Sequence, residues 1–107
     1  MDQRRFPRVP FRGSLDFGAA GAQDFQGTTA FDLSSGGVRM RSQEFIPLGD
    51  PVRVRFQLSE DKMVVLTGKV AWIQKEPNGE YYQMGIEFEE NPSNLLPRRS
   101  IQDYIQD

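Results

Sequence analysis

The chain has 107 residues, with 13 Lys and Arg, 15 Asp and Glu, and neither His nor Cys. Without His or Cys there is no Ser-His-Asp triad, no Cys-His nucleophile, no thiolate or imidazole zinc site and no disulfide framework. The length predicts one domain, and 7 Pro with 10 Gly favour short strands and turns over long helices. We therefore expect a single domain over residues 1–107 that is not an enzyme.

The N-terminal tip carries positive charge on an otherwise acidic chain. Residues 1–12 hold four arginines and one aspartate, a net charge of +3, while the other 95 residues hold 9 basic and 14 acidic groups, a net charge of −5. The overall charge of −2 argues against a DNA or RNA binder, and a small cationic tip suits a compact anion better than a long polyanion. We interpret residues 1–8 as a flexible, arginine-rich segment, although a solvated chain end gives the same pattern.

The sequence contains no apolar run of the length that a membrane span needs. The Arg4-Arg5 pair is not followed by the apolar segment that a twin-arginine signal requires. We therefore expect a cytoplasmic protein without membrane insertion.

Period-two alternation of apolar residues predicts six strands within residues 9–90. The expected strands lie at about residues 9–17, 25–33, 38–41, 52–58, 63–74 and 82–88. In the fifth strand Val70 and Trp72 share the apolar face, so we expect Trp72 in the core rather than against a ligand. The pair Asn78-Gly79 predicts a hairpin between the last two strands. Six such strands joined by tight turns favour an antiparallel β-barrel, because closure removes exposed edges.

Residues 91–107 predict a short C-terminal α-helix. One helical stripe can contain Leu96, Ile101, Tyr104 and Ile105. Pro97 is tolerated only in a first turn, so the helix is expected to begin near Leu96 and to cover an open end of the barrel. The predicted fold class is mainly all-β, a six-stranded antiparallel barrel with this helix.

Two short motifs carry the candidate chemistry. The first is Arg4-x-x-x-Arg8 with Arg5 beside it, and the second is Asp32-Leu33-Ser34-Ser35-Gly36-Gly37. The planar fork of arginine binds phosphate or a guanine edge bidentately and stacks on a flat base. Asp and Ser commonly cap turns and paired glycines supply positive φ, so the second motif alone also fits an ordinary turn.

Together the two motifs resemble the PilZ domain family, whose signature is Arg-x-x-x-Arg followed by Asp/Asn-x-Ser-x-x-Gly. The matching residues are Arg4, Arg8, Asp32, Ser34 and Gly37. The resemblance continues through Gly68-Lys69-Val70-Ala71-Trp72 and Met84-Gly85-Ile86-Glu87-Phe88, and so covers nearly the whole chain in the expected order. It implies a PilZ-type β-barrel with a C-terminal helix, in agreement with the strand count. It also implies a bacterial receptor for the second messenger cyclic di-GMP, in motility or biofilm regulation.

The resemblance implies that cyclic di-GMP binds at the five signature residues. Additional candidates are Arg5, Gly36 and Arg12. Phosphates and the O6/N7 edge of guanine suit the arginines, Asp32 supplies acceptors for guanine N1–H and N2–H₂, and Ser34 offers a further hydrogen bond. Gly36 and Gly37 leave room for the ligand near the backbone. Because Arg4 and Arg8 precede the first strand, we expect binding to order this tip. No cofactor and no metal are expected.

Several alternatives stay open at this point. Arg8 and Arg12 have the same spacing as Arg4 and Arg8, although Arg12 falls within the first predicted strand. The expected ligand is one cyclic di-GMP or an intercalated pair, on a monomer or a ligand-linked dimer. We expect a stand-alone domain that signals through an unidentified downstream protein. The alternative function is a PilZ-type adaptor that binds protein without nucleotide. A single-strand nucleic-acid barrel is less favoured, because most aromatic residues fall on the buried face.

The polar faces of the strands also carry charge of both signs. Their arginines form either a basic face or ion pairs with the acids on the same faces. The arginines are Arg39, Arg41, Arg53 and Arg55, and the acids are Glu44, Glu87 and Glu89. A metal site or an acid–base pair at Glu87, Glu89 and Glu90 is not expected, since the pattern contains no His.

Overall fold

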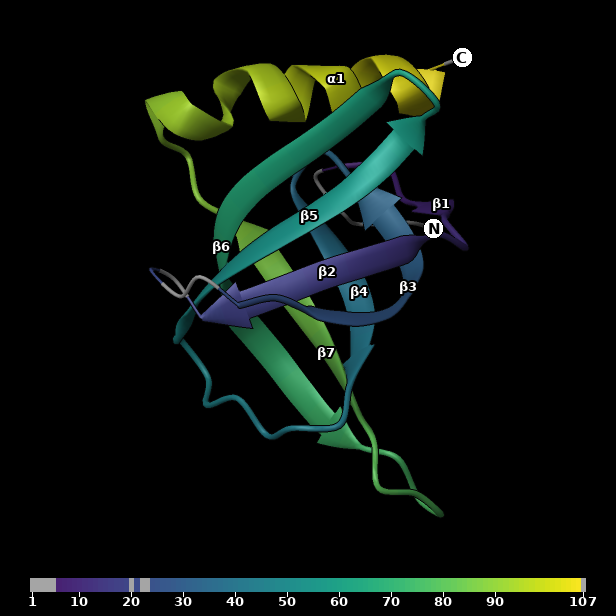
Figure 1. Cartoon of the computed structure of the whole chain (residues 1–107), viewed down its shortest axis with the longest axis vertical. Helices are drawn as coiled ribbons and strands as arrows, with labels where there is room; N and C mark the ends of the chain where they lie inside the picture. Colours follow the sequence, from purple (N-terminus) through teal and green to yellow (C-terminus); the bar gives the residue numbers. More distant parts are fainter. Residues whose placement is uncertain (1–5, 20, 22–23, 107) are drawn as a thin grey trace.

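The computed structural model describes residues 6–19, 21 and 24–106. These residues form seven strands, a short 3-10 helix and one α-helix (Figure 1). In chain order the elements are β1 (Val9–Pro10), β2 (Ser14–Ala19), β3 (Gln26–Ser34), β4 (Gly37–Ser42), β5 (Pro51–Ser59), β6 (Lys62–Lys75), β7 (Tyr82–Phe88), the 3-10 helix Pro92–Asn94 and α1 (Leu95–Gln106).

Six of the strands close into a barrel. Neighbouring strands are antiparallel in the order β3-β2-β5-β6-β7-β4, and β4 pairs back onto β3. The short strand β1 pairs with the end of β3, where Val9 lies opposite Leu33 and Pro10 lies opposite Asp32. The predicted six-stranded antiparallel barrel with a C-terminal helix is therefore confirmed, with β1 as one additional strand.

The first predicted strand, residues 9–17, is divided into β1 and β2. The pairing with β3 shifts by one residue between Pro10, which lies opposite Asp32, and Ser14, which lies opposite Thr29. Residues 11–13 between them belong to no strand. The N–H of Phe11 still donates to the carbonyl of Phe31 at 3.1 Å, so the segment continues along β3. This path brings Arg8, the residue before β1, to the end of β3.

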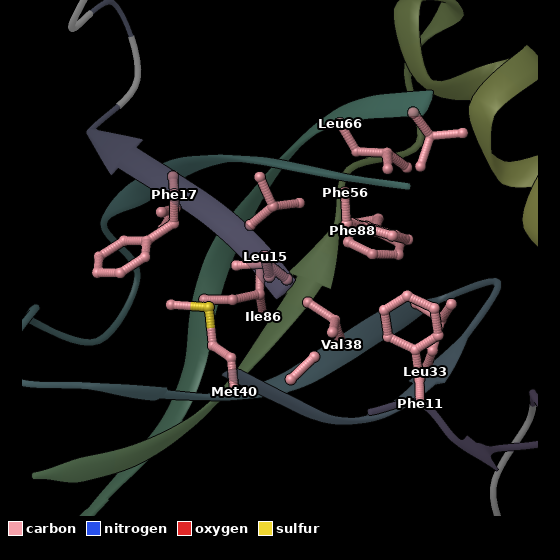
Figure 2. Packing of buried hydrophobic residues seen from close by; sticks show 14 of the residues in the cluster. Phe11, Leu15, Phe17, Leu33, Val38, Met40, Phe56, Leu66, Ile86 and Phe88 are labelled. Carbon is pink, nitrogen blue, oxygen red and sulfur yellow. The ribbon is translucent and has the colours of Figure 1, made fainter. Parts of the chain in front are cut away.

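The interior of the barrel is filled as the alternation predicts. On β5, Val52, Val54 and Phe56 are buried, whereas the arginines between them lie half-buried on the outer face. Side chains from several strands converge on one apolar cluster (Figure 2). They include Leu15, Leu33, Met40, Leu66 and Ile86. Burial of this apolar surface is the main term that stabilises the barrel, because the sequence has no cysteine to cross-link it.

Trp72 departs from the predicted pattern. The pairing of β6 with β7 shifts register between Val70 and Trp72, and Val70 is buried whereas Trp72 is 37% exposed. A bulge sets two residues of one strand against one residue of its partner, and the extra residue reverses the face on which the next side chain lies. The prediction that Trp72 packs in the core is therefore wrong.

Helix α1 crosses one end of the barrel (Figure 1). Ile101 is fully buried in the core and Ile105 packs against it, as predicted. Leu96, however, is 72% exposed, and Tyr104 is 39% exposed at the edge of the contact. At about 100° per residue, Leu96 lies about 140° from Ile101 around the helix, so the predicted stripe is wrong for Leu96. Neither helix in the described residues is long and apolar enough to span a membrane.

A buried asparagine fixes the start of α1 against the barrel. The side chain of Asn94 accepts from the N–H of Thr67 at 3.1 Å and donates to the carbonyls of Thr67 and Glu89 at 2.8 and 2.6 Å. Asn91 caps the 3-10 helix by accepting from the N–H of Asn94 at 3.1 Å. These bonds set the position of the first turn of α1 relative to β6.

Candidate ligand-binding site

The second motif forms a tight turn between β3 and β4. Ser34 and Gly37 are register partners, and the two residues between them make the turn. The hydroxyl of Ser34 accepts from the N–H groups of Gly36 and Gly37, both at 3.1 Å, and Ser34 is 3% exposed. This is the local side-chain-to-backbone bond that favours serine in turns. In this structure the hydroxyl of Ser34 therefore holds the shape of the turn.

The paired glycines are needed for space rather than for an unusual backbone. Neither Gly36 nor Gly37 has a positive φ, so the turn does not use the left-handed backbone that paired glycines can supply. A Cβ atom on Gly37 would collide with the carbonyl oxygen of Ile86 on β7, and one on Gly36 would collide with the ring of Phe6. The turn can therefore approach β7 and the N-terminal segment only because both side chains are absent.

The first and second motifs meet at Asp32. Arg8 Nη1 donates to Asp32 Oδ1 at 2.7 Å, although the two residues are 24 positions apart. The other carboxylate oxygen accepts from Arg39 Nε at 2.8 Å. The side chains of Arg8 and Asp32 are only 25% and 20% exposed, so these short, charge-assisted bonds are partly shielded from water. The structure thus places a shared carboxylate between two guanidinium groups.

Arg8 also lines a surface cavity of about 610 Å³, a volume within the range of small-molecule sites, which runs from roughly 300 to 1,000 Å³. The cavity lies between the β3–β4 turn, strands β6 and β7, and α1. Ser34, Gly36 and Gly37 of the turn contribute to its lining, and Asp32 lies beside it, joined through Arg8. Of the predicted site residues, Arg8, Ser34, Gly36 and Gly37 therefore share one cavity, and Asp32 is bonded to its edge.

Three aromatic residues, Phe6, Trp72 and Phe88, line this cavity, and Phe6 and Trp72 each lie against a glycine. The indole of Trp72 lies against Gly85, where a Cβ atom would come within 2.7 Å of Trp72 Cδ1. The ring of Phe6 lies against Gly36 in the same way. Flat aromatic faces of this kind can stack on the bases of a nucleotide. The sequence indicated neither contact, since Trp72 was expected inside the barrel.

Further cations in the lining come from α1 and β6. Arg98 Nε donates to the carbonyl of Ser35 at 2.9 Å, and its nearest carboxylate contact is Glu90 at 3.9 Å. Lys69 lies 3.7 Å from Glu87. The side chains of Glu87 and Glu90 are 61% and 68% exposed, so these long pairs are weak and an anionic ligand can compete with them. Arg98 was not expected here, because its position depends on how α1 docks.

The remaining candidates do not enter the cavity or lie outside the described residues. Arg4 and Arg5 fall in residues 1–5, outside the part of the chain that the structure describes. Arg12 is exposed between β1 and β2, and it does not contribute to the lining. Within the described ranges, no group of three or more His, Cys, Asp or Glu residues is placed to hold a metal ion.

Of the outer-face arginines, Arg39, Arg41 and Arg55 pair with acids other than Glu44, Glu87 and Glu89, and Arg53 contacts an aromatic ring. Arg39 bonds Asp32, Arg55 Nη2 lies 3.0 Å from Asp16 Oδ2, and the guanidinium of Arg53 lies 5.5 Å from the ring centroid of Phe25. These contacts connect neighbouring strands across the outside of the barrel.

The ion pair between Arg41 and Glu76 connects β4 to the loop after β6. Arg41 donates to both carboxylate oxygens, at 2.9 and 2.7 Å, and its guanidinium lies 4.2 Å from the ring centroid of Tyr81. The hydrogen bonds from Arg41 hold the pKa of Glu76 below its usual value. The same pair raises the pKa of Arg41.

Comparison with known proteins gives a consistent family. The family model of the PilZ domain matches residues 2–107, while no curated protein matches the chain. Solved structures of similar fold include the inhibitor of motility MotI/DgrA of Bacillus subtilis, with a TM-score of 0.78 and 17% identity over 99% of this chain and 51% of that chain. The MrkH–c-di-GMP complex of K. pneumonia has a TM-score of 0.73 and 19% identity over 100% of this chain and 52% of that chain.

The PilZ domain of YcgR with c-di-GMP, from Escherichia coli, has a TM-score of 0.68 and 14% identity over 98% of this chain and 93% of that chain. The chain spans about half the length of the MotI and MrkH chains that it matches. At these identities the similarity to solved structures shows the fold, whereas the family model covers almost every residue of the sequence. The chain belongs to the PilZ domain family.

Proposed function

We propose that this chain is a non-enzymatic bacterial receptor for cyclic di-GMP. The observation that carries the proposal is the bond between Arg8 and Asp32, which joins the two signature motifs at the edge of a cavity of about 610 Å³. Membership of the PilZ family supports it. Two solved PilZ-fold structures of similar shape, those of MrkH and of the YcgR PilZ domain, contain c-di-GMP.

The chemistry of the cavity suits both parts of this ligand. Its two phosphates carry negative charge, and Arg8, Lys69 and Arg98 provide cations from three separate segments of the chain. Its guanines are flat, and Trp72 offers an aromatic face for stacking. Guanine also presents N1–H and N2–H₂ donors, which a carboxylate such as Asp32 can accept and which adenine lacks.

Binding is proposed to rearrange the N-terminal segment. Arg8 exchanges Asp32 for a phosphate or for the O6/N7 edge of guanine, and Arg4 joins it on the ligand, with Arg5 as a secondary contact. The ordered segment then changes the surface that a downstream protein reads. Amide relaxation of residues 2–12 tests this step. Reduced mobility with ligand supports the rearrangement, and equal mobility with and without ligand contradicts it.

Calorimetric titration with cyclic di-GMP tests the proposal. The variants Arg8→Ala and Asp32→Ala are each expected to lose roughly 1–3 kcal/mol of binding free energy, which is the value of one bidentate or charge-assisted contact. Arg12→Ala is the matched control, because Arg12 belongs to the same segment but does not line the cavity. GTP, cyclic di-AMP and a single-stranded oligonucleotide test selectivity, and the same titration gives the stoichiometry.

A PilZ-type adaptor that binds protein without nucleotide is the second candidate. Leu95 and Leu96 favour it, since both are large apolar side chains on α1 and are 68% and 72% exposed. A wild-type chain that binds no cyclic di-GMP at tens of micromolar would promote this candidate. A loss of partner binding in Leu95→Ser and Leu96→Ser variants would then support it.

A further inference from the structure

The carboxylate of Asp32 is shared between two arginines from different parts of the chain. Arg8 Nη1 donates to Oδ1 at 2.7 Å, and Arg39 Nε donates to Oδ2 at 2.8 Å. Asp32 and Arg39 are register partners on β3 and β4, and each is flanked by a buried core residue, so both lie on the outer face of the barrel. Arg8 precedes β1, whereas Arg39 is part of the barrel itself.

Arg39 is held in place without help from the N-terminal segment. Its Nη1 donates to the side-chain oxygen of Gln83 on β7 at 3.3 Å, and its guanidinium lies 4.9 Å from the ring centroid of Phe31 on β3. Because a guanidinium is planar and rigid, these contacts fix its plane as well as its position. Residues of three barrel strands therefore define where Arg39 Nε points, and Arg39 Nε in turn fixes one oxygen of Asp32.

Recognition of guanine depends on the orientation of that carboxylate. The N1–H and N2–H₂ donors of guanine lie side by side, so both oxygens of one carboxylate must lie in the plane of the base to accept them. When Arg8 moves to the ligand, Oδ1 of Asp32 loses its partner. Because the terminal torsion of an aspartate has no sharp preference, the carboxylate could then rotate out of the plane of the base. Arg39 occupies one lone pair of Oδ2 and leaves the other for the ligand.

We propose that Arg39 is a positioning residue. It orients Asp32 for guanine recognition when Arg8 releases Asp32 and binds the ligand instead. This inference rests on the proposed cyclic di-GMP function. It assigns part of the selectivity for guanine to a β4 residue that lies outside both signature motifs.

Arg39→Gln tests the proposal, with Arg55→Gln as a closely matched control. Arg55 also donates to an aspartate, Asp16, at 3.0 Å, and its guanidinium lies 4.4 Å from the ring centroid of Phe25. The side chains of Arg39 and Arg55 are both 38% exposed. Arg39→Gln is expected to weaken cyclic di-GMP binding about tenfold, and Arg55→Gln less than about twofold.

The inosine analogue of cyclic di-GMP gives a measurement that a purely structural role of Arg39 would not change. Inosine lacks the N2 amine, so the ratio of the two affinities reports how well Asp32 accepts both donors. The ratio is measured on one protein preparation, and it is therefore independent of the fraction of the variant that folds. The wild type and Arg55→Gln are expected to prefer cyclic di-GMP, and Arg39→Gln is expected to lose most of that preference.

Arg39→Lys separates orientation from charge. Lysine keeps the charge but lacks the planar fork that donates to Asp32 and Gln83 at the same time. This variant is therefore expected to behave like Arg39→Gln. An unchanged affinity ratio in Arg39→Gln, or full recovery in Arg39→Lys, would overturn the positioning role while leaving the receptor function intact. A wild type that binds no cyclic di-GMP would overturn the receptor function, and the positioning role would fall with it.

Discussion

The indole ring of Trp72 lies against the backbone of Gly85, its register partner across β6 and β7. A Cβ atom at Gly85 would overlap the indole nitrogen, so the glycine is what lets the ring lie flat on the strand. The bulge beside Val70 turns Trp72 outward at the same position. Together, the bulge and the glycine convert an expected core residue into part of the cavity lining.

Trp72 is the single tryptophan in the sequence, so its fluorescence reports on this cavity. We predict that cyclic di-GMP changes the emission of the wild type, because a base stacks on the indole or displaces it. Gly85→Ala is expected to shift the indole and to weaken binding, whereas Gly27→Ala, whose added Cβ would lie 3.5 Å from its nearest neighbour, is expected to leave both unchanged. Saturable binding by calorimetry with unchanged emission would place the ligand away from Trp72.

Arg98 connects α1 to the β3–β4 turn through its bond to the carbonyl of Ser35. We predict that Arg98→Ala lowers the free energy of unfolding by about 1 kcal/mol and also weakens cyclic di-GMP binding, since the side chain lines the cavity. Urea unfolding and calorimetry measure the two effects. Arg99→Ala is the control, because Arg99 is an exposed arginine one position along the helix. If Arg98→Ala and Arg99→Ala showed the same stability and the same affinity for cyclic di-GMP, Arg98 would not be part of the binding site.

Asn94 is expected to be the most sensitive polar residue at the start of α1. Asn94→Ala removes three hydrogen bonds and leaves backbone groups of Thr67 and Glu89 without these partners. We predict a loss of about 2–4 kcal/mol in the free energy of unfolding, measured by urea denaturation. Ser93→Ala, an exposed position in the same 3-10 helix, is expected to change stability by less than about 0.5 kcal/mol. A loss in Asn94→Ala no larger than that of the control would show that Asn94 does not anchor α1.

The Arg41–Glu76 pair predicts a specific dependence of stability on pH. Its hydrogen bonds hold the pKa of Glu76 in the folded chain below the ordinary value of 4.5, so folding favours the ionised carboxylate. This contribution is complete above about pH 4.5 and is lost as the pH falls through the lowered pKa. We predict that Glu76→Gln is less stable than the wild type at neutral pH.

The difference in stability between Glu76→Gln and the wild type is expected to narrow as the pH falls below 4.5. Urea midpoints measured across this range test the prediction. Glu80→Gln, an exposed glutamate in the same loop, is expected to give a curve parallel to that of the wild type. A difference in stability between Glu76→Gln and the wild type that stays constant at all pH values would contradict a contribution that depends on the ionisation of Glu76.

The barrel could be predicted from the sequence because its strands alternate with period two over a buried face. On β5 that alternation continues without interruption, and the buried residues are expected ones. On β7, Met84, Ile86 and Phe88 are buried as expected, and Gly85 between them is buried as well. The departures occur where one extra residue enters a strand, at residues 11–13 and beside Val70. The position of a bulge depends on the partner strand, so the alternation in a single segment does not reveal it.

In the candidate site too, the residues of a local motif could be predicted, whereas contacts that depend on a partner strand or helix could not. Asp32, Ser34 and the paired glycines lie in or beside one turn, and a local motif is sufficient to indicate them. The bond between Asp32 and Arg39 depends on the register of β3 with β4, and the approach of Arg98 depends on how α1 docks on the barrel. The first contact is set by strand pairing across one hairpin and the second by the docking of distant segments, and neither is visible in the alternation of a single segment.

A calorimetric titration of the wild-type chain with cyclic di-GMP beside cyclic di-AMP tests the proposed receptor function most directly. We predict saturable binding of cyclic di-GMP at or below tens of micromolar, little or no binding of cyclic di-AMP, and a marked loss of affinity in Asp32→Ala. No heat of binding with cyclic di-GMP at these concentrations, or equal binding of the two cyclic dinucleotides, would contradict it.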